Sequence, residues 1–226
     1  MADPLSFRFT VAVAGMRGAG KTTLLARLRE SLARVERSAA AGDRHNFVKL
    51  HKNPSEDEGT SDSDHEVLTS YRLEDEASGR SCEARVLFHA LAANGGPSLS
   101  AMAQTCVEGV RAAVVLFDLA STSSYTVAKQ FVQALRDRDA DRKVVVALLA
   151  NKFTTMGGSR VVSTDGAMAY AASLGCLYFE VDAMSGSRCL EALDATLELC
   201  MEPLTHAKIT SRDLLGMNLN ALSAFQ

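Results

Sequence analysis

The sequence predicts an α/β fold in which a mostly parallel sheet of six strands is covered by helices on both faces. Apolar segments with strand-like patterns alternate with segments of helical periodicity along most of the chain, which is the order typical of such sheets. A glycine-rich loop also joins the first strand to the first helix. With 226 residues and 47% hydrophobic content, the chain can form one domain with a sizeable core and a tail.

The first strand is predicted at residues 7–14, where large apolar side chains alternate with smaller or polar ones. Residues 15–22 follow and read Gly15-Met-Arg-Gly-Ala-Gly-Lys-Thr22, which fits the phosphate-loop pattern G-x-x-x-x-G-K-[ST]. The next segment places four apolar side chains on one helical face, namely Leu24, Leu28, Leu32 and Val35. A strand, a glycine loop and a helix in this order are the context that the motif requires; a turn that binds nothing is the alternative.

Each residue type in this loop suits the binding of a polyphosphate. Backbone N–H groups at the start of a helix attract anions, and glycines allow the loop to curl with its amides inward. We expect Lys21 to reach the β- and γ-phosphates and the Thr22 hydroxyl to coordinate Mg²⁺. The predicted phosphate-binding set is Arg17, Gly18, Ala19, Gly20, Lys21, Thr22 and Thr23.

The middle of the chain begins with a polar stretch. Residues 36–66 lack apolar periodicity, and the acidic run at 55–66 has the composition of a solvated loop. Strands at 67–76 and 82–91 are then predicted to form a hairpin. A short loop leads to a helix at 98–109.

The second half alternates strands and helices. Continuous apolar runs at 112–117 and 143–150 are typical of parallel strands buried on both faces, and a last strand is expected at 177–181. Helices are predicted at 122–138, 163–174 and 187–201. Ser163 is expected to cap the second of these helices, Gly175 to stop it, and Pro203 to end the last one.

Composition excludes several classes of function. A net charge of −3 argues against nucleic acid as the main partner. No run of 18 apolar residues and no charged-then-apolar leader is found, so we expect a soluble cytoplasmic protein. The five cysteines are odd in number and scattered, which argues against a disulfide framework or a zinc site. No metal other than nucleotide-bound Mg²⁺ is supported.

Three motifs that follow predicted strands together resemble a Ras-superfamily small GTPase over roughly residues 6–202. They are the glycine loop, the pair Asn151-Lys152 and the segment Glu180-Val-Asp-Ala-Met184. The resemblance implies a G domain at 1–203, with an acidic insertion at about 40–66 in its first switch region, and a tail at 204–226. It implies GTP or GDP with Mg²⁺ as cofactors. It also implies that the base is held by Asn151, Lys152, Ala183 and Met184, with the Ala183 amide binding the guanine carbonyl.

The sequence departs from the family pattern at Thr154, where the family has an aspartate. A carboxylate accepts two charge-assisted hydrogen bonds from guanine, whereas a hydroxyl accepts one weaker bond. We therefore expect a reduced preference for guanine. The grip on the phosphates does not depend on the base and should survive.

The hydrolytic residues of the family are also replaced. Ala92 stands where the family has an aspartate that is an outer-sphere ligand of Mg²⁺, and Gly96 stands where it has the glutamine that orients the attacking water. Of this motif, only Gly95 is left to contact the γ-phosphate. Arg17 occupies a position where many relatives have a small residue, so it either crowds the water or places charge near the phosphates. We expect at most weak GTPase activity. The first-switch threonine for Mg²⁺ is Thr60 or Thr69, unless both are plain loop or strand residues.

The chain ends without a prenylatable cysteine, so no lipid anchor of the Rab kind is expected. Together with the altered motifs, this resembles the atypical Rab-like subunits of the intraflagellar transport complex. That resemblance implies a ciliary location and protein partners such as coiled-coil or transport subunits. The apolar tail at 204–226 is either a partner-binding segment or a frayed end.

The main hypothesis is a GTP-binding regulatory or assembly protein with slow or absent hydrolysis. The alternative is a scaffold subunit that keeps the fold and binds nucleotide structurally or not at all. An active P-loop enzyme such as a nucleotide kinase is disfavoured, because the sequence shows neither a basic lid nor an acceptor site.

Overall fold

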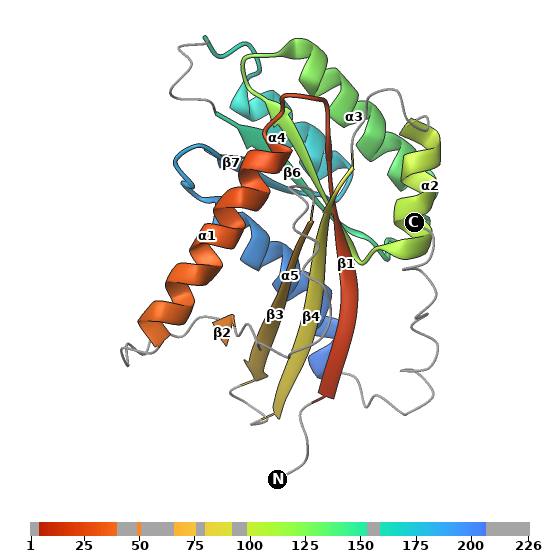
Figure 1. Cartoon of the computed structure of the whole chain (residues 1–226). Coiled ribbons are helices and arrows are strands. Elements are labelled where there is room, and N and C mark those ends of the chain that lie inside the picture. The colour runs from red at the N-terminus through yellow and green to blue at the C-terminus, as the bar shows by residue number, and fades with distance from the viewer. Residues whose placement is uncertain are drawn as a thin grey trace.

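The computed structural model describes residues 5–39, 49–50, 66–75, 80–91, 99–152 and 159–206. Within them, one twisted sheet carries helices on both faces (Figure 1). The elements in chain order are β1 (Leu5–Gly15), α1 (Lys21–Ala39), β2 (Lys49–Leu50), β3 (Glu66–Asp75), β4 (Arg80–Ala90), α2 (Leu99–Gly109), β5 (Ala112–Asp118), α3 (Thr122–Arg136), β6 (Val145–Asn151), α4 (Thr164–Ser173), β7 (Leu177–Val181) and α5 (Cys189–His206). The predicted α/β fold is confirmed.

The strands are arranged in the order β2-β3-β4-β1-β5-β6-β7. β1 pairs in parallel with β4 and β5, and β6 in parallel with β5 and β7. The β3–β4 hairpin is antiparallel, as predicted. The short edge strand β2, which pairs with β3, adds to the six strands expected from the sequence.

Two hydrophobic layers enclose the central strands. Along β5 the fully buried side chains alternate, so that Val114 and Leu116 face one layer while Val115 and Phe117 face the other. The first layer is completed by α1 and α5, and the second by α2, α3 and α4. This burial on both faces is the reason that β5 reads as a continuous apolar run.

The caps of α4 follow the sequence prediction, whereas the end of α5 does not. The Ser163 side chain accepts a hydrogen bond from the Gly166 amide at 3.3 Å, and Gly175 adopts a φ of 61° after the helix. The predicted stop at Pro203 is wrong, because α5 continues to His206. A proline removes only one helical hydrogen bond, and this loss lies within the last turns of an otherwise well-packed helix.

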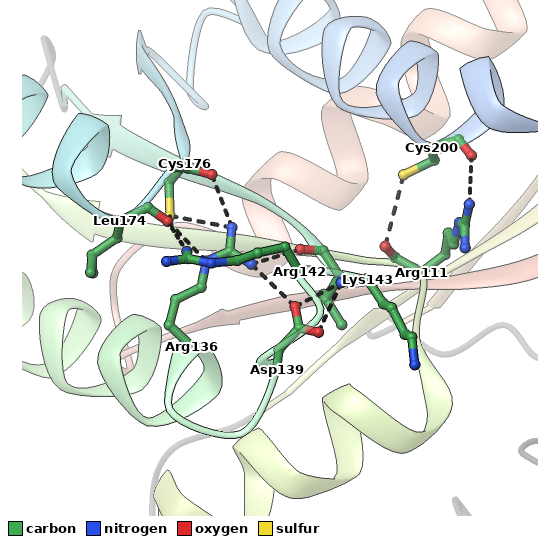
Figure 2. A network of polar contacts seen from close by, with 10 residues as sticks. Arg111, Arg136, Asp139, Arg142, Lys143, Leu174, Cys176 and Cys200 are labelled. Carbon is green, nitrogen blue, oxygen red and sulfur yellow. Dashed lines mark hydrogen bonds and ion pairs between the residues drawn. The ribbon is translucent and has the colours of Figure 1, made fainter.

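A buried ion pair lies at the amino ends of β6 and β7 (Figure 2). The Arg136 guanidinium pairs with Asp139 at 3.2 Å and donates to the carbonyls of Val144 at 2.9 Å and Gly175 at 3.0 Å. The Asp139 carboxylate also accepts from the backbone amides of Lys143 and Val144. The network joins the end of α3 to β6 and to the turn before β7, at the edge of the sheet opposite the phosphate loop.

In the described ranges, no helix is long and apolar enough to cross a membrane.

Candidate functional site

The loop between β1 and α1 needs glycine at positions that the motif marks. Gly15 has a φ of 146°, and a Cβ there would lie 2.4 Å from the Leu116 carbonyl oxygen of β5. Gly18 and Gly20 adopt φ values of 82° and 103°. A Cβ at Gly18 would meet nothing within 4 Å, so there the requirement is the positive φ alone. The first glycine is therefore fixed by contact with the neighbouring strand as well as by its own backbone.

A tight turn forms the tip of this loop. The Ala19 amide donates to the Met16 carbonyl at 3.1 Å, and Gly18, the third residue of the turn, has the positive φ that is typical of a type II turn. Arg17 and Gly18 occupy the two corners and are exposed, whereas Ala19 is buried. The turn thus presents Arg17 at the surface of the loop.

Lys21 begins α1 and folds back on the loop. Its ammonium donates to the carbonyl oxygens of Gly15 at 2.8 Å and Met16 at 3.0 Å, and partial burial lowers the pKa of this side chain. Thr22 is exposed and Thr23 is half-buried in the same first turn. The structure therefore brings the predicted phosphate-binding residues together at one helix N-terminus, where backbone amides and a cation can meet an anion.

Asn151, at the end of β6, connects this loop to the segment after β7. Its side chain is 0% exposed, donates to the Ala19 carbonyl at 3.0 Å and accepts from the Ala183 amide at 3.0 Å. The orientation of the side-chain amide follows from these two partners. The Lys152 backbone amide donates to the Val181 carbonyl at 2.8 Å, while its side chain is exposed. Asn151 thus clamps three segments that are distant in sequence.

Asp182 shapes the segment that carries Ala183 and Met184. Its carboxylate accepts from the backbone amides of Met184 at 2.9 Å and Ser185 at 3.2 Å, an arrangement in which an aspartate side chain closes its own turn. Ala183 is fully buried, whereas Met184 is 39% exposed. The Ala183 amide already donates to Asn151, so its role in binding a guanine carbonyl stays a prediction.

Sequence reasoning missed two features of this segment. Asp182 was given no role of its own from the sequence, although aspartate is one of the residues whose side chain closes such turns. Glu180 also binds more than was expected: its carboxylate pairs with Arg160, with N–O distances of 2.9 and 2.5 Å, and accepts from the hydroxyls of Thr164 and Tyr178. The hydrogen bonds from Arg160 lower the pKa of Glu180 to about 2. These contacts fix β7 against the start of α4.

Several predicted residues fall outside the described part of the chain. They are Thr60, Ala92, Gly95, Gly96 and Thr154, together with the side chain of Thr69 in β3. The predictions made for Mg²⁺ ligation by the first switch, for γ-phosphate contact and for base preference at these positions stay predictions. In the described ranges, no cluster of three His, Cys, Asp or Glu side chains could hold a metal ion by itself.

Comparison with known proteins supplies the family. The Ras family model matches residues 71–202, more than half of the chain. The chain is also similar to the GTP-binding protein ypt3 of Schizosaccharomyces pombe, with 33% identity over 89 residues, which are 39% of this chain and 41% of that protein. The chain thus matches less than half the length of this relative. The family match begins after the phosphate loop, so the geometry of that loop is an independent observation. By sequence match and by fold, the chain belongs to the Ras family.

Proposed function

We propose that this chain is a GTP-binding regulatory protein that holds GTP or GDP on the loop between β1 and α1. The observation that carries the proposal is the loop itself. Its glycines have the backbone angles that the phosphate-binding motif requires, and Lys21 lies against the loop at the start of α1. A glycine turn that bound nothing would have no need to keep a half-buried ammonium group next to a helix N-terminus.

The residues present fit a magnesium–nucleotide complex. Thr22 is exposed in the first turn of α1, and its hydroxyl is the oxygen that would contact Mg²⁺. Magnesium in such sites usually keeps water and phosphate oxygens as its other ligands. The ion would neutralise charge on the phosphates. Lys21 would move from the loop carbonyls toward the phosphate oxygens.

We further propose that hydrolysis is slow or absent. Ala92 and Gly96 stand where the family has its acidic and water-orienting residues. Without an oriented nucleophile, a nearby cation such as Arg17 contributes little to the rate. The bound triphosphate would then persist, and exchange rather than hydrolysis would set the nucleotide state.

The test uses the full chain. Nucleotide is extracted from the purified protein and identified by chromatography, and the emptied protein is titrated with GTP, GDP and ATP in the presence of Mg²⁺. We expect micromolar or tighter binding of GTP. Lys21→Ala should weaken it by about tenfold to a hundredfold, the value of one charge-assisted hydrogen bond.

The matched control is Lys143→Ala. This lysine is exposed, pairs with Asp141 at 2.7 Å and precedes β6 at the opposite edge of the sheet. The Lys143→Ala substitution should leave nucleotide affinity unchanged. A wild-type protein that is folded but indifferent to millimolar Mg²⁺ and every purine triphosphate would refute the proposal.

A second candidate function is a scaffold subunit in which nucleotide is a structural ligand. Two observations favour it: the Lys21 ammonium and the Ala183 amide are both satisfied by groups of the protein itself. A scaffold should bind with an affinity that is indifferent to the γ-phosphate, because a ligand that binds two states equally shifts neither. In that case Lys21→Ala should still assemble with its partners, whereas a GTP-dependent switch should lose them.

The narrower form of the proposal is a Rab-like subunit of intraflagellar transport, located in the cilium. It is supported by the departures from the family pattern at Ala92, Gly96 and Thr154. In ciliated cells, a tagged chain should concentrate in the cilium and purify with transport subunits. A uniform cytoplasmic distribution without such partners would contradict this narrower form and leave nucleotide binding unaffected.

A further inference from the structure

Arg17 occupies an unusual place for a charged side chain. It is the second residue of the turn closed by the hydrogen bond between the Ala19 amide and the Met16 carbonyl. Gly18 follows it with a φ of 82° and open space around the position of a Cβ. Arg17 is therefore an exposed residue at the corner of the turn that forms the tip of the phosphate loop.

The charge of Arg17 has no partner in the part of the chain that the structure describes. Other arginines do have one: Arg27 pairs with Glu30, Arg160 with Glu180, and Arg188 with Glu191. The ammonium group of Lys21, the other cation of the loop, donates hydrogen bonds to two backbone carbonyls of the loop. Among the residues that the structure describes, an anion bound to Arg17 would therefore replace no existing contact.

The hydrogen bonds that join the phosphate loop and β1 to neighbouring segments indicate on which side of the loop Arg17 lies. Ala19 is bonded to Asn151, at the β6–β7 side of the sheet where the base is expected. Arg17 precedes Ala19 by two residues, on the limb of the turn that joins β1. Beside that limb, the Leu91 amide donates to the Val13 carbonyl. A polyphosphate that starts near Asn151 and crosses the loop would thus end close to Arg17.

We propose that Arg17 binds the terminal phosphate of a nucleoside triphosphate and makes the site prefer the triphosphate over the diphosphate. This inference rests on the proposed function. A guanidinium group remains charged at all physiological pH values, and its planar fork matches two oxygens of one phosphate. A diphosphate lacks the group that Arg17 would contact. The preference would be a property of this chain's own loop and would not require an ordered switch segment.

The experiment compares a non-hydrolysable GTP analogue with GDP by calorimetric titration of the full chain in the presence of Mg²⁺. Arg17→Gln should weaken binding of the analogue by about tenfold to a hundredfold, the value of a charge-assisted hydrogen bond to phosphate, and change binding of GDP by less than about threefold. Arg17→Lys should retain part of the preference, because it keeps the charge but loses the fork.

Arg138→Gln is the matched control. Arg138 is exposed, donates to the Ala134 carbonyl at 2.9 Å and lies just after α3, far from the loop; its variant should bind both nucleotides as the wild type does. Thermal unfolding checks that each variant is folded.

An equal loss of both nucleotides in Arg17→Gln, or no loss of either, would overturn the role of Arg17. If either of these results is accompanied by the expected weakening of GTP binding in Lys21→Ala, the proposed function stands while this inference fails. A folded wild type that binds neither nucleotide would overturn both.

Discussion

Replacing Asn151 with alanine should loosen the site and destabilise the fold together. The substitution removes two buried hydrogen bonds, one to the Ala19 carbonyl and one from the Ala183 amide, each 3.0 Å long. Both partners are in buried residues, so each is left without a partner and costs about 1–3 kcal/mol. Allowing for relaxation and water entry, we expect a loss of about 2–5 kcal/mol in the free energy of unfolding, or about 5–15 °C in Tm for a chain of this size.

The assay is urea unfolding followed by circular dichroism, combined with GTP titration of the folded variant. Nucleotide affinity should fall as well, because the loop that carries Lys21 is held to β6 through this side chain. Asn151→Asp is the informative companion: its carboxylate can still accept from the Ala183 amide, but it faces the Ala19 carbonyl without a donor. A loss of less than about 1 kcal/mol for Asn151→Ala would refute the clamp, since even one unpaired buried group costs that much.

Three further changes test the rest of the framework. Asp139→Ala should lower the free energy of unfolding in urea by about 3–5 kcal/mol, because it leaves the buried Arg136 charge without its partner. Gly15→Ala should weaken both folding and GTP binding, measured by thermal melting and titration, because its Cβ would lie 2.4 Å from a β5 carbonyl oxygen. The folded-state pKa of Glu180 is about 2, below its usual 4.5, so its stabilising contribution is present above pH 4.5 and is lost as the pH falls toward 2. Glu180→Gln should flatten that part of the stability profile.

Each of these three predictions would be contradicted by a specific result. Wild-type-like unfolding of Asp139→Ala would show that the network in Figure 2 is dispensable. Normal GTP binding by Gly15→Ala would show that the loop can shift away from β5. An unchanged slope between pH 5 and pH 3 in Glu180→Gln, measured against the wild type, would show that another carboxyl group controls acid stability.

The fold could be predicted because the sequence patterns that indicate each strand and helix lie within short stretches of the chain. The apolar run of β5 and the strand–loop–helix order around Gly15 each lie within a short stretch of sequence, and burial on both faces requires such a run. The clamp made by Asn151 was not predictable in the same way. Its partners are 132 and 32 residues away, and an asparagine after a strand gives no indication of which carbonyl it will meet. The end of α5 was misjudged because a proline removes only one helical hydrogen bond, so Pro203 by itself does not end the helix.

The hydrogen bonds within the site indicate which part of a nucleotide should dominate its binding. Lys21 and the Ala183 amide each have a protein partner already, so a ligand that uses them exchanges one hydrogen bond for another and gains only the difference. The exposed Arg17 has no such exchange to make with the described residues, and in the proposed site it would contact the terminal phosphate. The base, by contrast, must compete with Asn151 for the Ala183 amide. Affinity should therefore follow the number of phosphates more closely than the identity of the base, as expected for a site that reports nucleotide state through its loop.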